Sequence, residues 1–206
     1  MARTHSKAEA HLTKVCPLMR RAVAKVGPCQ LELQPKRQPY ESLMRAVAHQ
    51  QLNGRAAETI LGRFGALYPR GRFPSPRAVL ATDAGDLRAV GFSHAKVRAL
   101  HDIALKAESG LVPGRAEISR MEDAAIIERL TQVRGVGRWT VEMLLIFQLG
   151  RPDVLPVDDF GVAKGFGLLK KMKEHPKPRQ LAEWGQRWAP YRTVASWYLW
   201  RVADGG

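Results

Sequence analysis

The sequence predicts an all-α protein, and three observations support this prediction. Apolar residues recur at helical spacing along most of the 206 residues. The alternation of strand and helix patterns that is typical of a βαβ unit is missing. The chain also contains no internal repeat and no low-complexity segment. A chain of this length can form one well-buried core or two small lobes.

The N-terminal part predicts two helical stretches joined by a short link. We expect a helix from Lys7 to Val26, with Pro17 bending or interrupting it. Residues 31–33 then form a short extended link. A second helix is expected over 41–50, capped by Ser42 or its neighbour.

The middle of the chain predicts further helices with marked starts. A turn at residues 51–54 precedes one helix, and Ser93 is expected to cap another that ends near Gly110. Ser119-Arg-Met-Glu122 matches a capping box, in which the Ser and Glu side chains each bond a backbone N–H at a helix start.

The C-terminal part begins with paired carboxylates at the end of a Gly/Pro loop. Asp158 and Asp159 precede a helix that is expected to run to about Lys171, and by themselves they would be an N-cap and a first-turn acid. Asp153, earlier in the loop, is expected to be solvated. A Pro-punctuated basic loop and helices near 178–188 and 190–202 follow.

The composition favours a polyanionic partner. The chain has 33 Lys and Arg against 19 Asp and Glu, a formal net charge of +14. A basic but inert surface is the alternative. Two cysteines imply no disulfide framework. Without a signal-peptide pattern or an apolar run of transmembrane length, we expect a cytoplasmic protein, nucleoid-associated if bacterial.

Residues 130–140 predict a tight hairpin between two helices. Helical spacing continues to Val133 and resumes at Val141, and the two glycines between them permit φ > 0. Their backbone N–H groups would be exposed at a helix N-terminus, where phosphate binds. The predicted phosphate-binding residues are therefore Gly135, Gly137, Arg134 and Arg138, which suggests a nucleic-acid partner.

Three segments, in this order and spacing, resemble the helix-hairpin-helix/Gly-Pro-Asp superfamily of DNA glycosylases, most closely its 3-methyladenine branch. They are Pro39 to Ala57, Gly135 to Thr140 and Pro156 to Asp159. The resemblance extends from about Lys7 to the C-terminus. It implies a two-lobed helix-hairpin-helix DNA glycosylase fold with a cleft between the lobes.

The two lobes would be built from different parts of one catalytic unit, residues 1–206. One lobe would comprise about 39–156, including the hairpin 130–140, and the other about 1–38 plus 157–206. We expect a minimal form, without the N-terminal β domain of some larger relatives.

The resemblance also implies that Asp159 is the catalytic carboxylate. Cleavage of a purine N-glycosidic bond builds positive charge on the sugar, which a fixed anion stabilises. The same carboxylate could orient the attacking water, and Asp158 would keep the capping role. Bifunctional relatives carry a nucleophilic lysine where this chain has Trp139, so the expected enzyme is monofunctional and leaves an abasic site.

Two tryptophans would form the base pocket. By resemblance, Trp139 and Trp200 hold the cationic alkylated purine by stacking and cation–π attraction. Core packing is the alternative for Trp139. The remaining tryptophans are expected in the core: Trp184, Trp188 and Trp197.

The turn after the helix at 41–50 would provide the plug. A glycosylase that extrudes a nucleotide must fill the vacated stack. By resemblance this is the role of Gln51, Leu52 and Asn53. The alternative is a helix-ending turn with Leu52 tucked inward.

No cofactor is expected, although the resemblance implies a monovalent cation, Na⁺ or K⁺, at the hairpin when DNA is bound. Its ligands would be the backbone carbonyls of Thr131, Val133 and Val136. No cysteine follows Cys29, which excludes the iron–sulfur cluster of some relatives, and no His/Cys set has zinc spacing. A basic cluster either reaches flanking DNA or is a solvated face: Lys170, Lys171, Lys173, Lys177 and Arg179.

The function implied by the resemblance is a monofunctional alkylpurine DNA glycosylase of base excision repair. It would act as a monomer on double-stranded DNA containing 3-methyladenine or 7-methylguanine type bases, away from membranes. Two alternatives stand beside it. A glycosylase of the same fold for another damaged or mismatched base is disfavoured by Trp139. A non-catalytic hairpin module that binds DNA would not need an acid like Asp159.

Overall fold

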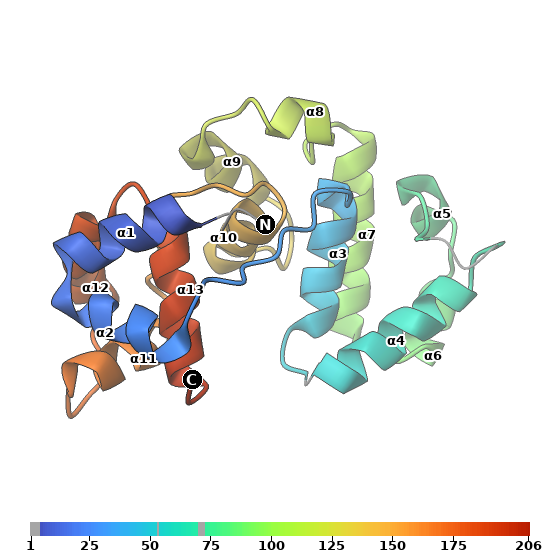
Figure 1. The fold of residues 1–206 in the computed structure, drawn as a ribbon. Coiled ribbons are helices and arrows are strands. Elements are labelled where there is room, and N and C mark those ends of the chain that lie inside the picture. Colours follow the sequence, from blue (N-terminus) through green and yellow to red (C-terminus); the bar gives the residue numbers. More distant parts are fainter. Residues whose placement is uncertain (1–4, 53, 70–72) are drawn as a thin grey trace. The chain divides into compact units, whose positions relative to one another are not determined.

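The computed structural model describes residues 5–52, 54–69 and 73–206. Helices dominate these ranges and no strand occurs in them, which confirms the all-α prediction. None of the described helices combines the length and the apolar character that crossing a membrane requires. The chain divides into two compact units, coloured by sequence in Figure 1. The central unit is Pro35–Leu144, and the terminal unit joins the segment up to Gln34 to Leu145–Gly206.

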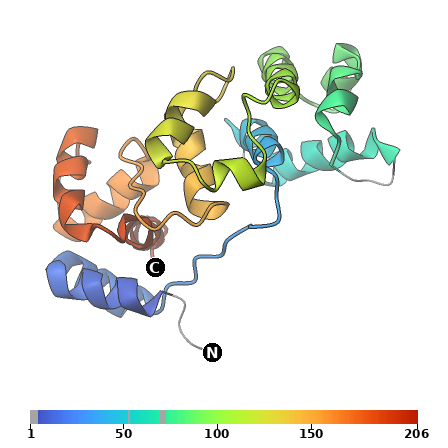
Figure 2. The ribbon, with the colours of Figure 1, turned by 90° about the horizontal axis from the view of Figure 1, so that it is seen from above.

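The central unit is organised around its longest helix. That helix, α7, contacts α3, α5 and α6 and lies beside α3 in both views (Figures 1 and 2). The helices are α3 (Pro39–His49), α4 (Gly54–Ala66), α5 (Pro76–Leu80), α6 (Ala84–Ala89), α7 (His94–Glu108), α8 (Arg115–Ile118), α9 (Asp123–Leu130) and the first part of α10 (Arg138–Phe147). Phe64 is buried, and the rings of Tyr68, Phe73 and Phe92 meet it edge-on at centroid distances of 5.4–5.9 Å.

Helix starts in the central unit correct two sequence predictions and confirm one. Ser93 caps α7 as expected, its hydroxyl accepting the Lys96 N–H at 3.3 Å. The capping box at Ser119–Glu122 is wrong, because Ser119 ends the unpredicted short helix α8 and Glu122 is the N-cap of α9 without a side-chain cap bond. Helix α3 begins at Pro39 rather than near Ser42, since proline suits the first helical position.

The terminal unit contains α1 (Ser6–Val15), α2 (Pro17–Val26), α11 (Phe160–Lys170), α12 (Pro178–Gly185), a 3₁₀ turn at Gln186–Trp188 and α13 (Arg192–Ala203). The expected helix over 7–26 is two helices, because proline disfavours helical backbone in the residue before it and Cys16 is extended (φ −144°, ψ 110°). The helices expected after Asp159 and near 178–188 and 190–202 are confirmed.

The core of the terminal unit surrounds α13, which contacts α1, α2 and α11. Trp188 is fully buried there, and Trp184 and Trp197 pack against this core partly buried. Gly165 lets α11 approach α13 closely, because a Cβ at that position would lie 1.9 Å from the Leu199 carbonyl oxygen. This close crossing brings the start of α11 and the end of α13 together.

The Gly/Pro loop before α11 is fastened to the first turn of α13. Both Asp153 carboxylate oxygens accept hydrogen bonds from the Arg192 guanidinium, at 2.7 and 2.9 Å. Thr193 accepts the Val154 N–H at 3.0 Å and donates to the Arg151 carbonyl at 2.6 Å. The loop therefore belongs to the terminal unit, and the division falls between Leu144 and Leu145 rather than at the expected boundary near 156.

The expectation that Asp153 is solvated is wrong. Burial opposes ionisation of its carboxyl group, but the hydrogen bonds and charge of Arg192 outweigh burial and lower the pKa of Asp153 below its usual 3.8. The same ion pair raises the pKa of Arg192. A bidentate pair of this geometry holds the loop in one position.

Candidate functional site

Asp159 is the N-cap of α11 and is held from two sides. Its Oδ1 accepts the Val162 backbone N–H at 2.8 Å and the Trp200 indole N–H at 2.8 Å. Only 9% of its surface is exposed. The capping role expected for Asp158 is therefore wrong: Asp159 has the extended backbone of an N-cap (φ −77°, ψ 121°), and Asp158 precedes it, exposed.

Phe147 and Gly161 determine how the Trp200 indole lies against Asp159. The indole stacks on Phe147 with ring centroids 5.7 Å apart and planes 21° from parallel. A Cβ at Gly161 would lie 2.8 Å from Trp200 Cδ1 and 3.2 Å from Asp159 Oδ1. The missing side chain at Gly161 thus leaves room for the indole against the carboxylate.

Sequence reasoning did not identify Phe147, Gly161 or Phe160 as site residues. Phe160 follows Asp159 directly and is 69% exposed, which is unusual for a large aromatic side chain. Glycine inside a helix is disfavoured by propensity, but Gly165 and Gly167 in the same helix give the same signal, so it did not single out Gly161. An aromatic residue at Phe147 is indistinguishable from a core residue by pattern alone.

The terminal unit therefore contains an oriented carboxylate beside an aromatic pair. Two N–H donors fix one oxygen of Asp159 at the positive end of α11. Such an anion can stabilise positive charge that develops next to it, and the stacked indole can form a wall for a planar cation.

The hairpin of the central unit is braced against α7. The Arg134 N–H donates to Asp102 Oδ2 at 2.7 Å, and the Lys106 ammonium donates to the Gln132 carbonyl at 2.8 Å. Gly135 is left-handed (φ +78°), and a Cβ there would lie 3.0 Å from Ala99 Cβ. The hairpin backbone is thus fixed by contacts that a larger residue at Gly135 would disturb.

Gly137 differs from its neighbour and faces open space. It does not adopt a left-handed conformation, so the expected φ > 0 holds for Gly135 alone. A Cβ at Gly137 would meet no atom within 4 Å. This leaves room for a ligand to approach the backbone at the start of α10.

The residues around the start of α10 carry charge and an exposed ring. Arg138 is 61% exposed, and its Nε donates to Oε1 of the buried Glu142 at 2.9 Å, which orients the guanidinium. Arg134 is exposed as well. Trp139 is 42% exposed, which contradicts the core-packing alternative. Trp139 and Asp159 belong to different units.

The turn that was predicted to act as a plug is hydrogen-bonded to the hairpin within the central unit. Gln51 is left-handed (φ +57°), and Leu52 is 39% exposed, which contradicts the alternative of a leucine tucked inward. Asn53 lies outside the described residues. Gln50, just before the turn, donates its side-chain N–H to the Gly135 carbonyl at 2.9 Å.

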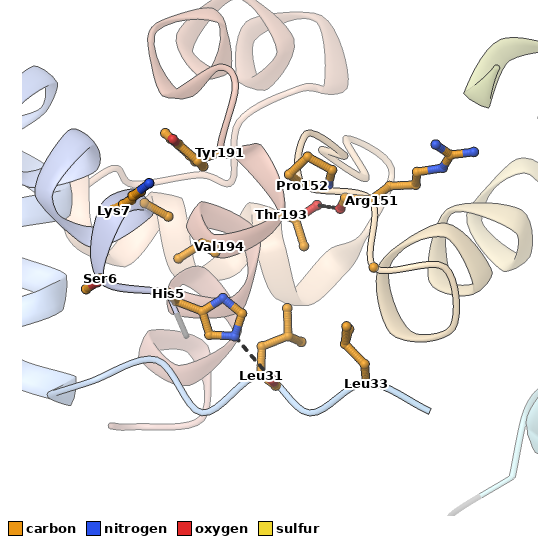
Figure 3. A pocket seen from close by; sticks show the side chains of 12 residues that line it. His5, Ser6, Lys7, Leu31, Leu33, Arg151, Pro152, Tyr191, Thr193 and Val194 are labelled. Carbon is orange, nitrogen blue, oxygen red and sulfur yellow. Dashed lines mark hydrogen bonds between the residues drawn. The ribbon is translucent and has the colours of Figure 1, made fainter. Parts of the chain in front are cut away.

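Figure 3 shows a separate cavity of about 450 Å³ in the terminal unit. It contains none of the predicted site residues. Its lining consists of His5, Ser6, Lys7, Ala8, Leu31, Leu33, Gly150, Arg151, Pro152, Tyr191, Thr193 and Val194. In the described ranges, no three His, Cys, Asp or Glu side chains form a group suited to a metal ion.

The comparison with protein families matches the description "HhH-GPD superfamily base excision DNA repair protein" to residues 44–190. DNA-3-methyladenine glycosylase 1 of Schizosaccharomyces pombe is 42% identical over 199 residues, covering 96% of this chain and 87% of the relative. The alkylbase DNA glycosidase-like protein mag2 of the same yeast is 35% identical over 203 residues, covering 96% and 93%.

Solved structures agree with these sequence matches. The S. pombe 3-methyladenine DNA glycosylase Mag1 in complex with abasic DNA has a TM-score of 0.86 and 42% identity, covering 95% of both chains. A DNA-3-methyladenine glycosidase from Bacillus halodurans has a TM-score of 0.83 and 34% identity, covering 94% of this chain and 87% of that one. The hairpin, the capped carboxylate that follows it and these matches together place the chain in the HhH-GPD superfamily of base excision DNA repair proteins.

Proposed function

We propose that this protein is a monofunctional DNA glycosylase that removes alkylated purines, of the 3-methyladenine and 7-methylguanine type, from double-stranded DNA. Its product is an abasic site in base excision repair. The observation that carries the proposal is the carboxylate of Asp159, oriented by the Val162 amide and the Trp200 indole in a chain of this superfamily.

The chemistry follows from the charge of the substrate and the position of the acid. Alkylation at N3 or N7 makes the purine cationic, so the base is a good leaving group and needs no strong general acid. As the N-glycosidic bond breaks, positive charge builds on the sugar, and the Asp159 carboxylate stabilises it. The carboxylate also orients a water molecule, which adds to the sugar and completes hydrolysis.

The aromatic side chains select a planar, cationic base. Trp200 is held in one orientation by Phe147 and Asp159, so it offers a preformed face for stacking. A cation over a tryptophan face gains about 0.5–2 kcal/mol, which favours alkylated purines over neutral ones.

The central unit is proposed to hold the DNA. The backbone amides near Gly137, with Arg134 and Arg138, bind phosphate, and Gln51 and Leu52 fill the space that the flipped nucleotide leaves. Carbonyls of Thr131, Val133 and Val136 would hold a monovalent cation. Thr131 fits by position, because it is the C-cap of α9 and the negative end of a helix attracts a cation.

Release of free bases from methylated DNA tests the proposal directly. Purified protein is incubated with duplex treated with a methylating agent, and the released bases are separated by chromatography. We expect 3-methyladenine and 7-methylguanine, with strand cleavage only after alkali or heat. Duplexes carrying uracil or 8-oxoguanine distinguish a glycosylase for other bases, and binding without any release would indicate a non-catalytic module.

Trapping with borohydride tests whether the enzyme is monofunctional. The position after the hairpin holds Trp139 rather than an amine, so no Schiff base with the sugar is expected. A covalent protein–DNA adduct after reduction would show that another amine attacks the sugar. Sedimentation with and without DNA tests the accompanying proposal that the protein acts as a monomer.

A further inference from the structure

The side chain of Gln50 connects the plug turn to the hairpin. Gln50 is the C-cap residue of α3, immediately before the turn, and its Nε2 donates to the Gly135 carbonyl at 2.9 Å. The two residues are 85 positions apart in the sequence. The bond therefore ties two segments that local structure alone would leave independent.

Both partners of this hydrogen bond belong to segments that pack against α7. The Lys96 ammonium of α7 donates to the Ala48 carbonyl at 2.7 Å, which satisfies one of the open carbonyls at the end of α3. A Cβ on Gly135 would lie 3.0 Å from Ala99 of α7 and 3.9 Å from Val47 of α3. The end of α3, the middle of α7 and the hairpin thus pack together around the Gln50 bond.

The residues of the turn itself, Gln51 and Leu52, are exposed. Gln51 has a left-handed backbone, which is unfavourable for a residue with a side chain. Leu52 is 39% exposed, although it is a large apolar residue. A hydrogen bond of 3.0 Å joins His49 Nε2 of α3 to Glu58 Oε1 of α4 and links the two helices that flank the turn. These contacts hold the ends of the turn, and Gln50 sets its position against the hairpin.

We propose that Gln50 is a positioning residue that holds the inserting turn, Gln51–Leu52, at a fixed position relative to the hairpin that binds DNA phosphate. This inference rests on the proposed function, because it assigns the turn to the space left by a flipped nucleotide. When the hairpin holds the DNA backbone, Leu52 then meets the base stack in one orientation. Without the bond, the hairpin still binds phosphate but the turn is free to move.

The main test removes the donor and keeps the side-chain volume. In Gln50→Met, we expect the single-turnover rate of base excision at saturating protein to fall about fivefold, the factor that loss of one neutral hydrogen bond produces. Affinity for undamaged duplex should stay within about twofold, since phosphate contacts do not depend on the turn. Thr59→Val is the matched control, because it removes a hydrogen bond to the Arg55 carbonyl within α4 without touching the hairpin.

A double-variant cycle with Leu52→Ala separates positioning of the turn from a general structural role. If Gln50 acts through Leu52, then Gln50→Met should change the excision rate less than about twofold in the Leu52→Ala background. Multiplying effects would overturn the proposal. An unchanged rate in Gln50→Met would also overturn it, as would an equal loss of affinity for damaged and undamaged duplex.

A readout without catalysis separates this inference from the proposed function. A duplex with an abasic analogue beside 2-aminopurine reports insertion of a side chain into the stack by a change in fluorescence. Wild-type protein should produce the change and Gln50→Met should reduce it. If wild-type protein releases no base yet shows this difference, the function fails and the positioning role stands. If it releases base and the fluorescence changes are equal, the positioning role fails alone.

Discussion

At the scale of single residues, Asp159 performs two tasks with one oxygen. Oδ1 caps α11 and accepts the indole N–H of Trp200. Asparagine keeps a carbonyl oxygen that can do both, but it lacks the negative charge. We therefore expect Asp159→Asn to release no methylated base while it binds an abasic-site duplex within a few-fold of wild type. Single-turnover assays and binding titrations measure the two effects.

Two neighbouring variants show whether charge or fold is responsible for this loss. Asp159→Ala removes the cap and should cost about 1 kcal/mol of unfolding free energy in addition to the activity. Asp158→Asn, at an exposed position before the cap, should change stability by less than about 0.5 kcal/mol. Near wild-type excision by Asp159→Asn would show that this carboxylate is not the catalytic group.

At the scale of elements, the crossing of α11 and α13 depends on Gly165. An added Cβ would lie 1.9 Å from the Leu199 carbonyl oxygen, so the helices must separate. Gly165→Ala should destabilise the protein by about 3 kcal/mol or more, measured by chemical denaturation. Because the same crossing brings Trp200 to Asp159, base excision by the folded fraction should fall as well.

A second glycine provides the control for Gly165. Gly62 lies inside α4, and a Cβ there would meet no atom within 4 Å. Gly62→Ala should raise the free energy of unfolding by about 0.5–1 kcal/mol, because alanine is the better helix former. Equal effects of the two substitutions would mean that the helices do not cross as closely as the structure shows.

The two glycines of the hairpin, Gly135 and Gly137, differ in role. Gly137 has open space around its Cβ position and no left-handed backbone, so Gly137→Asp should fold normally. Its negative charge would face phosphate, and affinity should fall more than about tenfold on damaged and undamaged duplex alike. Fluorescence anisotropy measures both. Normal binding of undamaged DNA, with the fold intact by circular dichroism, would exclude the hairpin as the DNA anchor.

At the scale of the whole molecule, sequence periodicity predicted the helices that are long enough to show it. Helix α7 spans four turns of repeating apolar positions, whereas α5, α6 and α8 have five, six and four residues. A period of 3.6 residues cannot be detected in such short segments. Ser119 was assigned to the wrong helix end for this reason, since the helix that it terminates was not expected.

The candidate site was predictable only in part, because its contacts are long-range. Asp159 and Trp200 are 41 residues apart, and no local pattern links them. Their assignment came from resemblance to a known family, which identified the residues but not their contacts. The choice between Asp158 and Asp159 as the cap depended on where the backbone enters the helix, and two adjacent acids give the same sequence signal. The hydrogen bond from Gln50 to Gly135 could not be predicted either, because the two residues are 85 positions apart and no local pattern links them.

The net charge of the molecule predicts that its binding to DNA depends on salt. A formal charge of +14 suits a protein whose DNA affinity comes largely from phosphate contacts, each of which releases counterions. Affinity for undamaged duplex should fall at least about tenfold between about 50 and 200 mM salt. The single-turnover rate of excision at saturating protein should change much less, because the Asp159 carboxylate is 9% exposed and shielded from bulk ions. Titrations and rate measurements over one salt series test both statements. A flat affinity would show that the positive charge does not serve DNA binding, and a rate that falls in parallel would place the salt effect on the chemical step.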